Sequence, residues 1–372
     1  MTFVIITHVP HILLQNKYFA YSPYVKEMNI WTQYADRVII VAPKTDAERT
    51  VIDSAYEHGT IEFVAIENFD ILTVKSILNT IFKMPKISWS IFKAMQAANY
   101  IHLRCPGNVG LLGSIIQIGF PTKIKIAKYA GNWDPKSKQP WTYKLQQHIL
   151  SNTFLTRKMQ VLVYGEWKGS SKNIKPFFTA TYTEADKLPI SKKVILEQIN
   201  FVFVGALVKG KNPMYAIQLL EAFAKKGNNV RLSLYGEGTE RALLESYILK
   251  NKLEKIISLE GNQSQETVKK AYQNSHFVIL PSDSEGWPKA LAEGMFWGCV
   301  PMARAVSCVP FMLDYGKRGI LVTLDLDNDL RQISDCVFDE TIYSTMSTAA
   351  QKWSQQFTLN LFEQKINRLM AN

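Results

Sequence analysis

The sequence predicts an α/β protein with two domains, each built on a doubly wound parallel sheet. A chain of 372 residues is long for a single hydrophobic core. Short apolar runs alternate with helical patterns in both halves of the chain, and this alternation is typical of parallel sheets. The periodicity is lost between residues 170 and 195, so the first domain is predicted to span 1–180 and the second 195–350.

The first half opens with an apolar strand and continues as strands alternating with helices. An aromatic-rich segment runs from Tyr18 to Trp31, and its part from Tyr24 onward has a helical pattern. Two helical stretches are expected between 71 and 100, separated near Pro85, because proline removes a backbone donor inside a helix. Strands are predicted at 2–6, 37–42, 61–66, 101–104, 124–129 and 161–164.

The second half repeats this plan from a strand that ends at Gly205. Strands are predicted at 201–204, 230–235, 256–259, 277–280 and 319–323, with helices at 214–226, 239–250 and 265–274. Another helix is expected to start at Pro288 and to stop at Gly298, since proline suits a first helical turn and glycine a helix end. Apolar positions at helical spacing predict one last helix over 353–372.

The excess positive charge lies in the first half of the chain. Residues 1–180 contain 21 basic and 11 acidic residues, whereas residues 181–372 contain 22 and 21. Such a surface suits an anionic partner, such as an acidic membrane face or a lipid-linked phosphate. A solvated basic surface without a partner explains the same count. Nucleic acid is not expected, because no nucleic-acid-binding module is recognisable.

One helical region supports the membrane alternative. Lysines and aromatic residues interleave between 71 and 100, for example Lys83, Lys86 and Lys93 with Trp89 and Phe92. Helices of this kind lie in membrane interfaces. Core packing on one side and a solvated face on the other explain the same pattern, so both interpretations stay open.

The sequence contains no recognisable metal-binding pattern, membrane-spanning run or signal peptide. The four cysteines and six histidines show no metal-ligand spacing, and reduced thiols are expected. No apolar run approaches the roughly 18 residues that span a bilayer, and the first residues do not resemble a signal peptide. A cytoplasmic protein is predicted, with the inner face of the cell membrane as its one candidate membrane surface.

The stretch from Val278 to Pro301 combines the end of a strand, a polar turn and a helix, and it carries two glutamates, Glu285 and Glu293. Glu285 precedes the helix and Glu293 follows eight residues later, a little over two turns away. The N–H groups of the first turn, with Lys289, can hold a phosphate. Carboxylates beside a phosphate site fit a nucleotide sugar, whose hydroxyls adjoin its phosphates. The plain alternative is a capped helix with Glu293 on a solvated face.

This stretch, P-S-D-S-E-G-W-P-K-A-L-A-E-G-M-F-W-G-C-V-P, closely resembles the donor-binding motif of the retaining GT-B glycosyltransferases of family 4. Three other segments resemble donor loops of that family, in the same order. G-A-L-V-K-G-K-N-P resembles the diphosphate loop, Y-G-E-G-T-E-R a G-x-G-x-x-R turn, and L-E-G-N-Q the loop that reads the base. Lys211 stands at the family's lysine. Ala206 replaces the family's arginine, a departure for which Lys209 or Lys289 can compensate.

The resemblance implies a GT-B fold: two Rossmann-like doubly wound domains facing each other across a cleft, with the C-terminal helix crossing back to the first domain. The second domain would bind a UDP- or GDP-linked sugar. Glu285 and Lys211 would be catalytic, Glu285 by positioning the donor sugar and Lys211 by stabilising the leaving diphosphate. Glu293 would bind the ribose. The other expected donor-binding residues are Gly205, Lys209, Gly236, Gly238, Asn262, Gly286, Lys289, Ala290 and Leu291. Neither an enzymic nucleophile nor a cofactor or metal ion is expected.

The first half resembles bacterial surface-polysaccharide glycosyltransferases in I-H-L-R-C-P-G-N, K-Y-A-G-N-W-D and V-L-V-Y-G-E-W. Loops after these strands lie where open α/β sheets bind ligands. Arg104, Asn132, Trp133 and Asp134 are therefore candidates for the acceptor side, where a glycan or polyprenyl-linked glycan would bind. The family's cleft histidine has no clear counterpart, since Arg104 and Ala130 stand near its expected places.

Other functions stay open. A nucleotide-sugar epimerase on the same fold would need an acid–base set that the sequence does not reveal. A degenerate protein that binds a nucleotide sugar without chemistry is favoured by Ala206 and by the missing histidine. A dinucleotide dehydrogenase is disfavoured, because no G-x-G-x-x-G follows the first strand.

Overall fold

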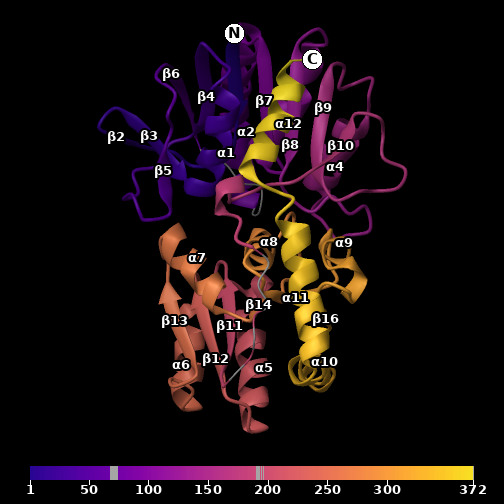
Figure 1. The fold of residues 1–372 in the computed structure, drawn as a ribbon. Coiled ribbons are helices and arrows are strands. Elements are labelled where there is room, and N and C mark those ends of the chain that lie inside the picture. Colours follow the sequence, from indigo (N-terminus) through magenta and orange to yellow (C-terminus); the bar gives the residue numbers. More distant parts are fainter. Residues whose placement is uncertain (68–73, 190–192, 194, 196, 372) are drawn as a thin grey trace. The chain divides into compact units, whose positions relative to one another are not determined.

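The chain forms two compact units (Figure 1). The computed structural model describes residues 1–67, 74–189, 193, 195 and 197–371, with the backbone alone for 74–81. Unit 1 comprises Met1–Phe178 with Glu363–Asn372, and unit 2 comprises Thr179–Phe362. Each unit contains one large parallel sheet, so the predicted fold class of two Rossmann-like α/β domains is confirmed. Residues 71–73, where the predicted helical region begins, and residue 372 lie outside the described residues.

The sheet of unit 1 has the strand order β10-β9-β8-β7-β1-β4-β6, and all its strands are parallel. Central strands are continuous apolar runs because both faces are covered; Phe3, Val4, Ile5 and Ile6 are fully buried. The bounds are Thr2–Ile6 (β1), Arg37–Pro43 (β4), Ile61–Ile66 (β6), Tyr100–Cys105 (β7), Ile124–Tyr129 (β8), Met159–Tyr164 (β9) and Ile174–Phe177 (β10).

The structure corrects the expected break near Pro85. One helix, α2, runs over Val74–Ala97 with Pro85 inside it. A proline costs an interior helix one hydrogen bond, and this site is exposed, so water can satisfy the carbonyl that loses its partner. The other helices of unit 1 are α1 (Ser22–Thr32), α3 (Asn108–Ile116) and α4 (Trp141–Ser151), with a 3₁₀ turn at Gln117–Gly119.

Several short strands were not predicted. An antiparallel three-stranded sheet is built from β2 (Ile12–Leu14), β3 (Lys17–Tyr21) and β5 (Asp53–Ala55). Strands of three to five residues are too short for a hydrophobic period to be read from them. Strand β10 also lies inside the segment that the sequence analysis treated as the aperiodic boundary.

The sheet of unit 2 has the order β13-β12-β11-β14-β15-β16, again all parallel. Its strands are Ile199–Val204 (β11), Val230–Tyr235 (β12), Ile257–Gly261 (β13), Phe277–Leu280 (β14), Val300–Arg304 (β15) and Ile320–Val322 (β16). Its helices are Pro213–Lys225 (α5), Arg241–Lys250 (α6), Gln265–Asn274 (α7), Lys289–Phe296 (α8), Val309–Met312 (α9), Leu326–Phe338 (α10) and Glu340–Ser354 (α11), with 3₁₀ turns at 184–186, 209–211 and 314–316. Strand β15 was not predicted.

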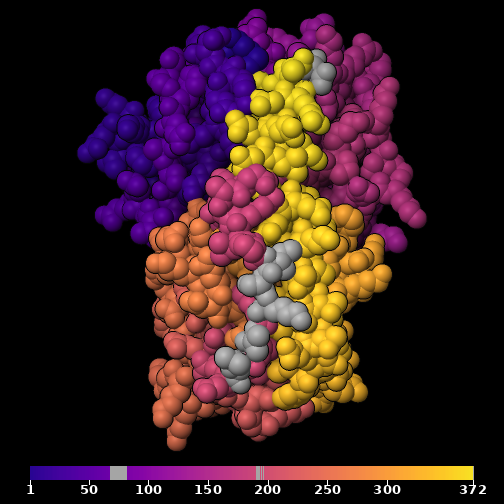
Figure 2. Space-filling view, viewed as in Figure 1, coloured from indigo at the N-terminus to yellow at the C-terminus, as the bar shows by residue number. Residues whose placement is uncertain are grey.

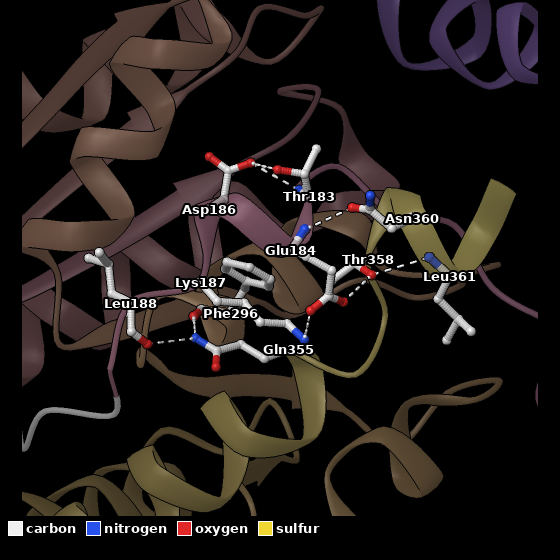
Figure 3. Close-up of polar contacts among 10 residues, drawn as sticks. All are labelled: Thr183, Glu184, Asp186, Lys187, Leu188, Phe296, Gln355, Thr358, Asn360 and Leu361. Atoms are coloured by element: carbon white, nitrogen blue, oxygen red, sulfur yellow. Dashed lines mark hydrogen bonds and ion pairs between the residues drawn. The ribbon is translucent and has the colours of Figure 1, made fainter. Parts of the chain in front are cut away.

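The predicted single helix over 353–372 is wrong. Helix α11 ends at Ser354, and α12 spans Leu359–Met370. Thr358 separates them, because its hydroxyl accepts from the N–H of Leu361 (3.3 Å) and so caps the start of α12. The same hydroxyl donates to the carboxylate of Glu184 (2.7 Å), whose own N–H donates to the side chain of Asn360 (2.8 Å) (Figure 3). Residues 183–188 and 355–361 are thus tied together within unit 2.

The last part of α12 belongs to unit 1 although it is remote in sequence from the rest of it. Ile366 is fully buried, and the ammonium of Lys365 lies 5.4 Å from the ring centre of Phe178. The side chain of Gln33, directly after α1, donates to Glu363 (2.8 Å). In Figure 2 the yellow α12 lies across unit 1 between its indigo and magenta segments.

No helix in the described parts of the chain combines the length and the apolar character needed to cross a bilayer.

Candidate functional site

The loops at the carboxyl ends of β11 and β12 are held in direct backbone contact. A Cβ atom on Gly236 would collide with the carbonyl oxygen of Gly205, and one on Gly238 with that of Leu207. The N–H of Leu207 donates to the carbonyl of Glu237 (2.9 Å). Three predicted donor residues, Gly205, Gly236 and Gly238, thus lie together at this edge of the sheet, and the two glycines after β12 allow the close approach.

A second pair of loops meets around one ion pair. The ammonium of Lys211, after β11, lies 2.5 Å from Oε1 of Glu285, after β14. Glu285 is 9% exposed and Lys211 28%, so the pair is sheltered without being closed off. Asn212 supports it by donating to the carbonyl of Pro281 and to the carboxylate of Asp283, both at 2.9 Å. The structure therefore brings the two predicted catalytic residues into contact.

Helix α8 begins directly after this pair. Pro288 is its N-cap and has no side chain that could cap the first turn. Lys289, Ala290 and Leu291 form that first turn, and Gly286 lies in the loop before it. The carbonyl of Gly286 accepts from the thiol of Cys308 (3.1 Å), which fixes the loop. The helix therefore presents its positive N-terminal end at the carboxyl edge of the sheet, beside Lys211.

Glu293 lies within α8 and is held by a second segment of unit 2. The hydroxyl of Thr181 donates to its Oε1 (2.5 Å). The next residue, Gly294, packs against β14, and a Cβ there would lie 2.5 Å from a methyl carbon of Val278. The missing side chain lets α8 lie close to the sheet, which positions both ends of the E-x7-E segment.

The remaining predicted donor residues lie at the same edge. Lys209 is exposed in the loop after β11, and Asn262 is exposed after β13. Ala206 is also exposed, and no positive charge takes its place in that loop except the two lysines that follow. Arg304 was missed by sequence reasoning: it ends β15 and pairs with Asp283 on the loop after β14. No sequence signal marked it, because β15 itself was not predicted.

The acceptor-side candidates lie at the carboxyl edge of unit 1. Arg104 is near the end of β7, while the other three follow β8. Trp133 is 5% exposed and packs edge-on against Tyr129 at 4.7 Å, so it belongs to the core. Asn132 accepts from the N–H of Asp134 (2.9 Å), which folds this loop on itself. Of the four, Arg104 has the charge and position best suited to contact a ligand.

Arg104 belongs to a buried charge cluster that the sequence analysis did not identify. Its Nη1 and the Nζ of Lys128 both lie 3.0 Å from Oε1 of Glu27 on α1. Burial opposes the negative charge, yet the ammonium of Lys128 and the guanidinium of Arg104 hold the pKa of Glu27 at about 2. A sequence signal did exist: two lysines, Lys125 and Lys128, interrupt the buried strand β8.

Two histidines next to this cluster are neutral at pH 7. Burial lowers the pKa of His102 to about 3, against the opposing effect of Glu27. Burial and the positive charge of Arg104 lower the pKa of His8, which follows β1. The ring of His8 lies against the backbone of Gly107, where an added Cβ would be 3.0 Å from its Nδ1. No group of three or more metal-ligating side chains occurs among the described residues.

Most of the second unit is similar to known proteins. Residues 186–353 match the family "Glycosyl transferases group 1". WcaL of Salmonella typhimurium, a glycosyltransferase assigned to colanic acid biosynthesis, is 26% identical over 186 residues, which cover 47% of this chain and 44% of that protein. The chain spans less than half of the length of the curated relatives that it first matches.

Two solved structures share the fold over the whole chain. HepE from Anabaena, solved with UDP and glucose, has a TM-score of 0.72 at 13% identity and covers 100% of this chain and 99% of its own. Sucrose-phosphate synthase from Thermosynechococcus elongatus has a TM-score of 0.69 at 18% identity and covers 100% and 98%. At these identities the likeness concerns the fold.

Proposed function

We propose, from the match of residues 186–353 to the glycosyl transferases group 1, that this chain is a retaining glycosyltransferase of surface-polysaccharide synthesis. It would move a sugar from a nucleotide-sugar donor to a glycan or lipid-linked glycan. The colanic acid assignment of WcaL supports the polysaccharide context, and the complex of HepE with UDP makes UDP the first nucleotide to test.

The single observation that carries the proposal is the ion pair of Lys211 with Glu285 beside the N-terminus of α8. A positive side chain and a helix N-terminus together suit a diphosphate. A carboxylate in the same place suits the hydroxyls of a sugar. A buried carboxylate would repel a simple phosphate, so the combination favours a nucleotide sugar, whose hydroxyls the carboxylate can bind.

In this reaction the charge develops on the leaving diphosphate as the glycosidic bond breaks. Lys211, the N–H groups of Lys289 and Ala290, and Lys209 would stabilise that charge, and they lie at one edge of the sheet before the reaction starts. Glu285 would position the donor sugar and Glu293 the ribose. No protein nucleophile, cofactor or metal ion is assigned to the reaction.

Membrane contact is part of the proposal. The exposed face of α2 carries Phe82 (84% exposed) and Trp89 (58% exposed), which stacks on Phe92 at 5.7 Å. The ammonium of Lys93 lies 5.3 Å from the ring of Trp89. Exposed aromatic residues next to lysines suit the interface of an anionic membrane. Unit 1 would thereby meet a lipid-linked acceptor at the inner face of the cell membrane.

A thermal-shift screen against UDP, GDP and their sugar conjugates tests the donor site. A ligand that binds only the native state raises the melting temperature. We expect a rise with one nucleotide in the unaltered chain and its loss in Glu293→Ala. No response to any nucleotide at millimolar concentration would overturn the proposal.

A second candidate, a protein that binds the nucleotide sugar without chemistry, is favoured by one observation: exposed Ala206 leaves the diphosphate loop without the family's arginine. Release of free nucleotide from the bound sugar conjugate, with and without a polyprenyl-linked glycan, separates the two. Binding without any turnover would favour the binding protein.

A further inference from the structure

The cluster at the carboxyl edge of unit 1 contains more positive than negative charge. One carboxylate oxygen, Oε1 of Glu27, faces both Arg104 and Lys128 at 3.0 Å. Its pKa of about 2 keeps it charged at physiological pH. Lys128 is fully buried and Glu27 is 5% exposed, so water screens the cluster poorly. Glu27 therefore offers a single negative charge to two cations, and His8 and His102 are neutral beside them.

Arg104 is the member of this cluster that a ligand can reach. Its side chain is 14% exposed, whereas Lys128 is fully enclosed. Among the described residues, the bond to Glu27 is the one hydrogen bond of its side chain, although a guanidinium has five N–H groups. The central carbon of the Arg104 guanidinium lies 5.4 Å from the ring centre of Tyr24, and this contact restricts the orientation of the guanidinium. Arg104 is thus fixed in orientation and has donors to spare.

The backbone beside Arg104 adds further positive potential. The chain leaves β7 through Pro106 and Gly107 and enters α3 at Asn108. Gly107, the N-cap of α3, has no side chain to cap the helix. The ring of His8 lies against Gly107 and can donate a hydrogen bond while neutral. A guanidinium, a helix N-terminus and an imidazole therefore surround one position at the end of β7.

We propose that Arg104, His8 and the N-terminus of α3 bind an anionic group, a phosphate or a carboxylate, of the acceptor. The assignment of this anion to the acceptor rests on the proposed function. The anion site itself does not, since all its residues belong to unit 1. Arginine matches the paired oxygens of either group. An acceptor with a neutral glycan end and no nearby phosphate would leave the excess positive charge of the cluster uncompensated, although Arg104 stays paired with Glu27.

Titration of the full chain with small anions tests this site. The chain is first saturated with UDP, and then methyl phosphate, glucuronate and the neutral methyl α-glucoside are added in separate calorimetric titrations. We expect one or both anions to bind and the neutral sugar not to. Arg104→Gln is expected to weaken the anion about tenfold or more, as the loss of a charge-assisted hydrogen bond implies. Preference between the anions distinguishes a phosphate-bearing acceptor from a uronic acid.

The variants are chosen so that folding does not decide the result. Arg104→Gln leaves Glu27 paired with Lys128, so the buried charges balance. His8→Ala removes the imidazole beside Gly107 and is expected to weaken binding of the same anion. Arg37→Gln is the matched control. Arg37 is an exposed arginine of unit 1 that pairs with Glu62 at the starts of β4 and β6, whereas Arg104 lies near the end of β7.

Three results would overturn the site: equal binding of all three probes, unchanged anion binding in Arg104→Gln, or anion binding that disappears when UDP is present. The last would assign the anion to the donor. Failure of UDP itself to bind would instead remove the proposed function while leaving the anion titration readable.

Discussion

Lys211 and Glu285 are the residues on which the proposed donor site depends most directly. The pair joins the loops after β11 and β14, so each side chain also holds the other in place. Its shelter from water makes the interaction stronger than a surface ion pair. Removing Lys211 would leave a nearly buried carboxylate without its cation, in the place where the diphosphate is proposed to bind.

Lys211→Ala is expected to weaken UDP binding about ten- to a hundredfold, since a hydrogen bond to a charged group contributes about 1.5–3 kcal/mol. Titration calorimetry measures the affinity. Lys250→Ala, at the exposed end of α6, is the control and should bind UDP as the unaltered chain does. Equal affinities for both variants would place the diphosphate elsewhere.

His102 makes unit 1 sensitive to acid. Burial lowers its pKa to about 3 in the folded chain from the ordinary value of 6.5, so the unfolded chain binds more protons between these values. Stability therefore falls as pH decreases through this range, by up to about 1.4 kcal/mol per unit. His11, whose burial lowers its pKa to about 4, acts with the same sign.

His102→Phe is expected to flatten the dependence of unfolding free energy on pH between 6.5 and 4.5. The ring lies among Phe3 and Trp31, and both of its nitrogens lack partners, so phenylalanine suits the site. Denaturant unfolding at several pH values measures this. Above 4.5 the carboxyl of Glu27 contributes little. The exposed His148→Gln should leave the slope as it is; an unchanged slope in His102→Phe would contradict the assignment.

At the scale of elements, the packing of α8 on β14 sets the position of the helix that is proposed to bind the donor. Gly294→Ala would put a methyl group 2.5 Å from a methyl carbon of Val278. We expect a loss of about 1–3 kcal/mol in unfolding free energy, as in other overpacked cores, together with weaker UDP binding. Gly210→Ala is the control for stability, because its Cβ would meet nothing within 4 Å. If Gly294→Ala changed neither the unfolding free energy nor UDP binding, α8 would be able to shift away from β14 without cost.

Helix α2 is the element on which the proposed membrane contact depends. The double variant Phe82→Ser, Trp89→Gln is expected to lose co-sedimentation with vesicles rich in phosphatidylglycerol, since the exposed rings supply the apolar contact. Added salt should weaken the binding of the unaltered chain. Phe338→Ser, which removes another well-exposed ring on α10 of unit 2, should still bind. Binding that survives in the double variant would assign the contact to another surface.

At the scale of the whole molecule, the end of the chain completes unit 1. A chain that stops at residue 358 would uncover the surface against which Ile366 is buried. We expect unfolding of unit 1 at lower denaturant, with a loss of at least about 2–3 kcal/mol from that side chain and its neighbours. Circular dichroism during urea unfolding measures it. Removal of residues 371–372 alone should change little, and equal midpoints for both truncations would contradict this role of α12.

The predicted strands were found where both faces of a strand are buried. Such strands read as continuous apolar runs, and β1, β4, β12 and β14 were placed within a residue or two of their bounds. The three-residue strands β2 and β5 carry no readable period. The break before α12 depends on Thr358 and its partner Glu184, 174 residues away in the chain, so periodicity alone extended the helix through it.

The structure brings the predicted donor residues to one edge of the sheet, and each of them lies in a short continuous loop with its own residue pattern. Fold geometry then only had to bring the strand ends together, which a parallel sheet does by construction. Arg304 and Thr181 escaped prediction because their relation to the site exists only in space. The same holds for Glu27, 77 residues from Arg104 in sequence.

The sequence by itself determined the two α/β domains, the strand–turn–helix segment from Val278 to Pro301 that resembles a donor-binding motif, and the excess of positive charge in the first half. These properties are local or additive, so they can be read along the chain. Only the tertiary structure decided that Lys211 contacts Glu285, that Trp133 is a core residue, and that one carboxylate faces both Arg104 and Lys128. Contacts and burial depend on which distant segments pack together. The energy of a charge depends on the environment that this packing creates around it.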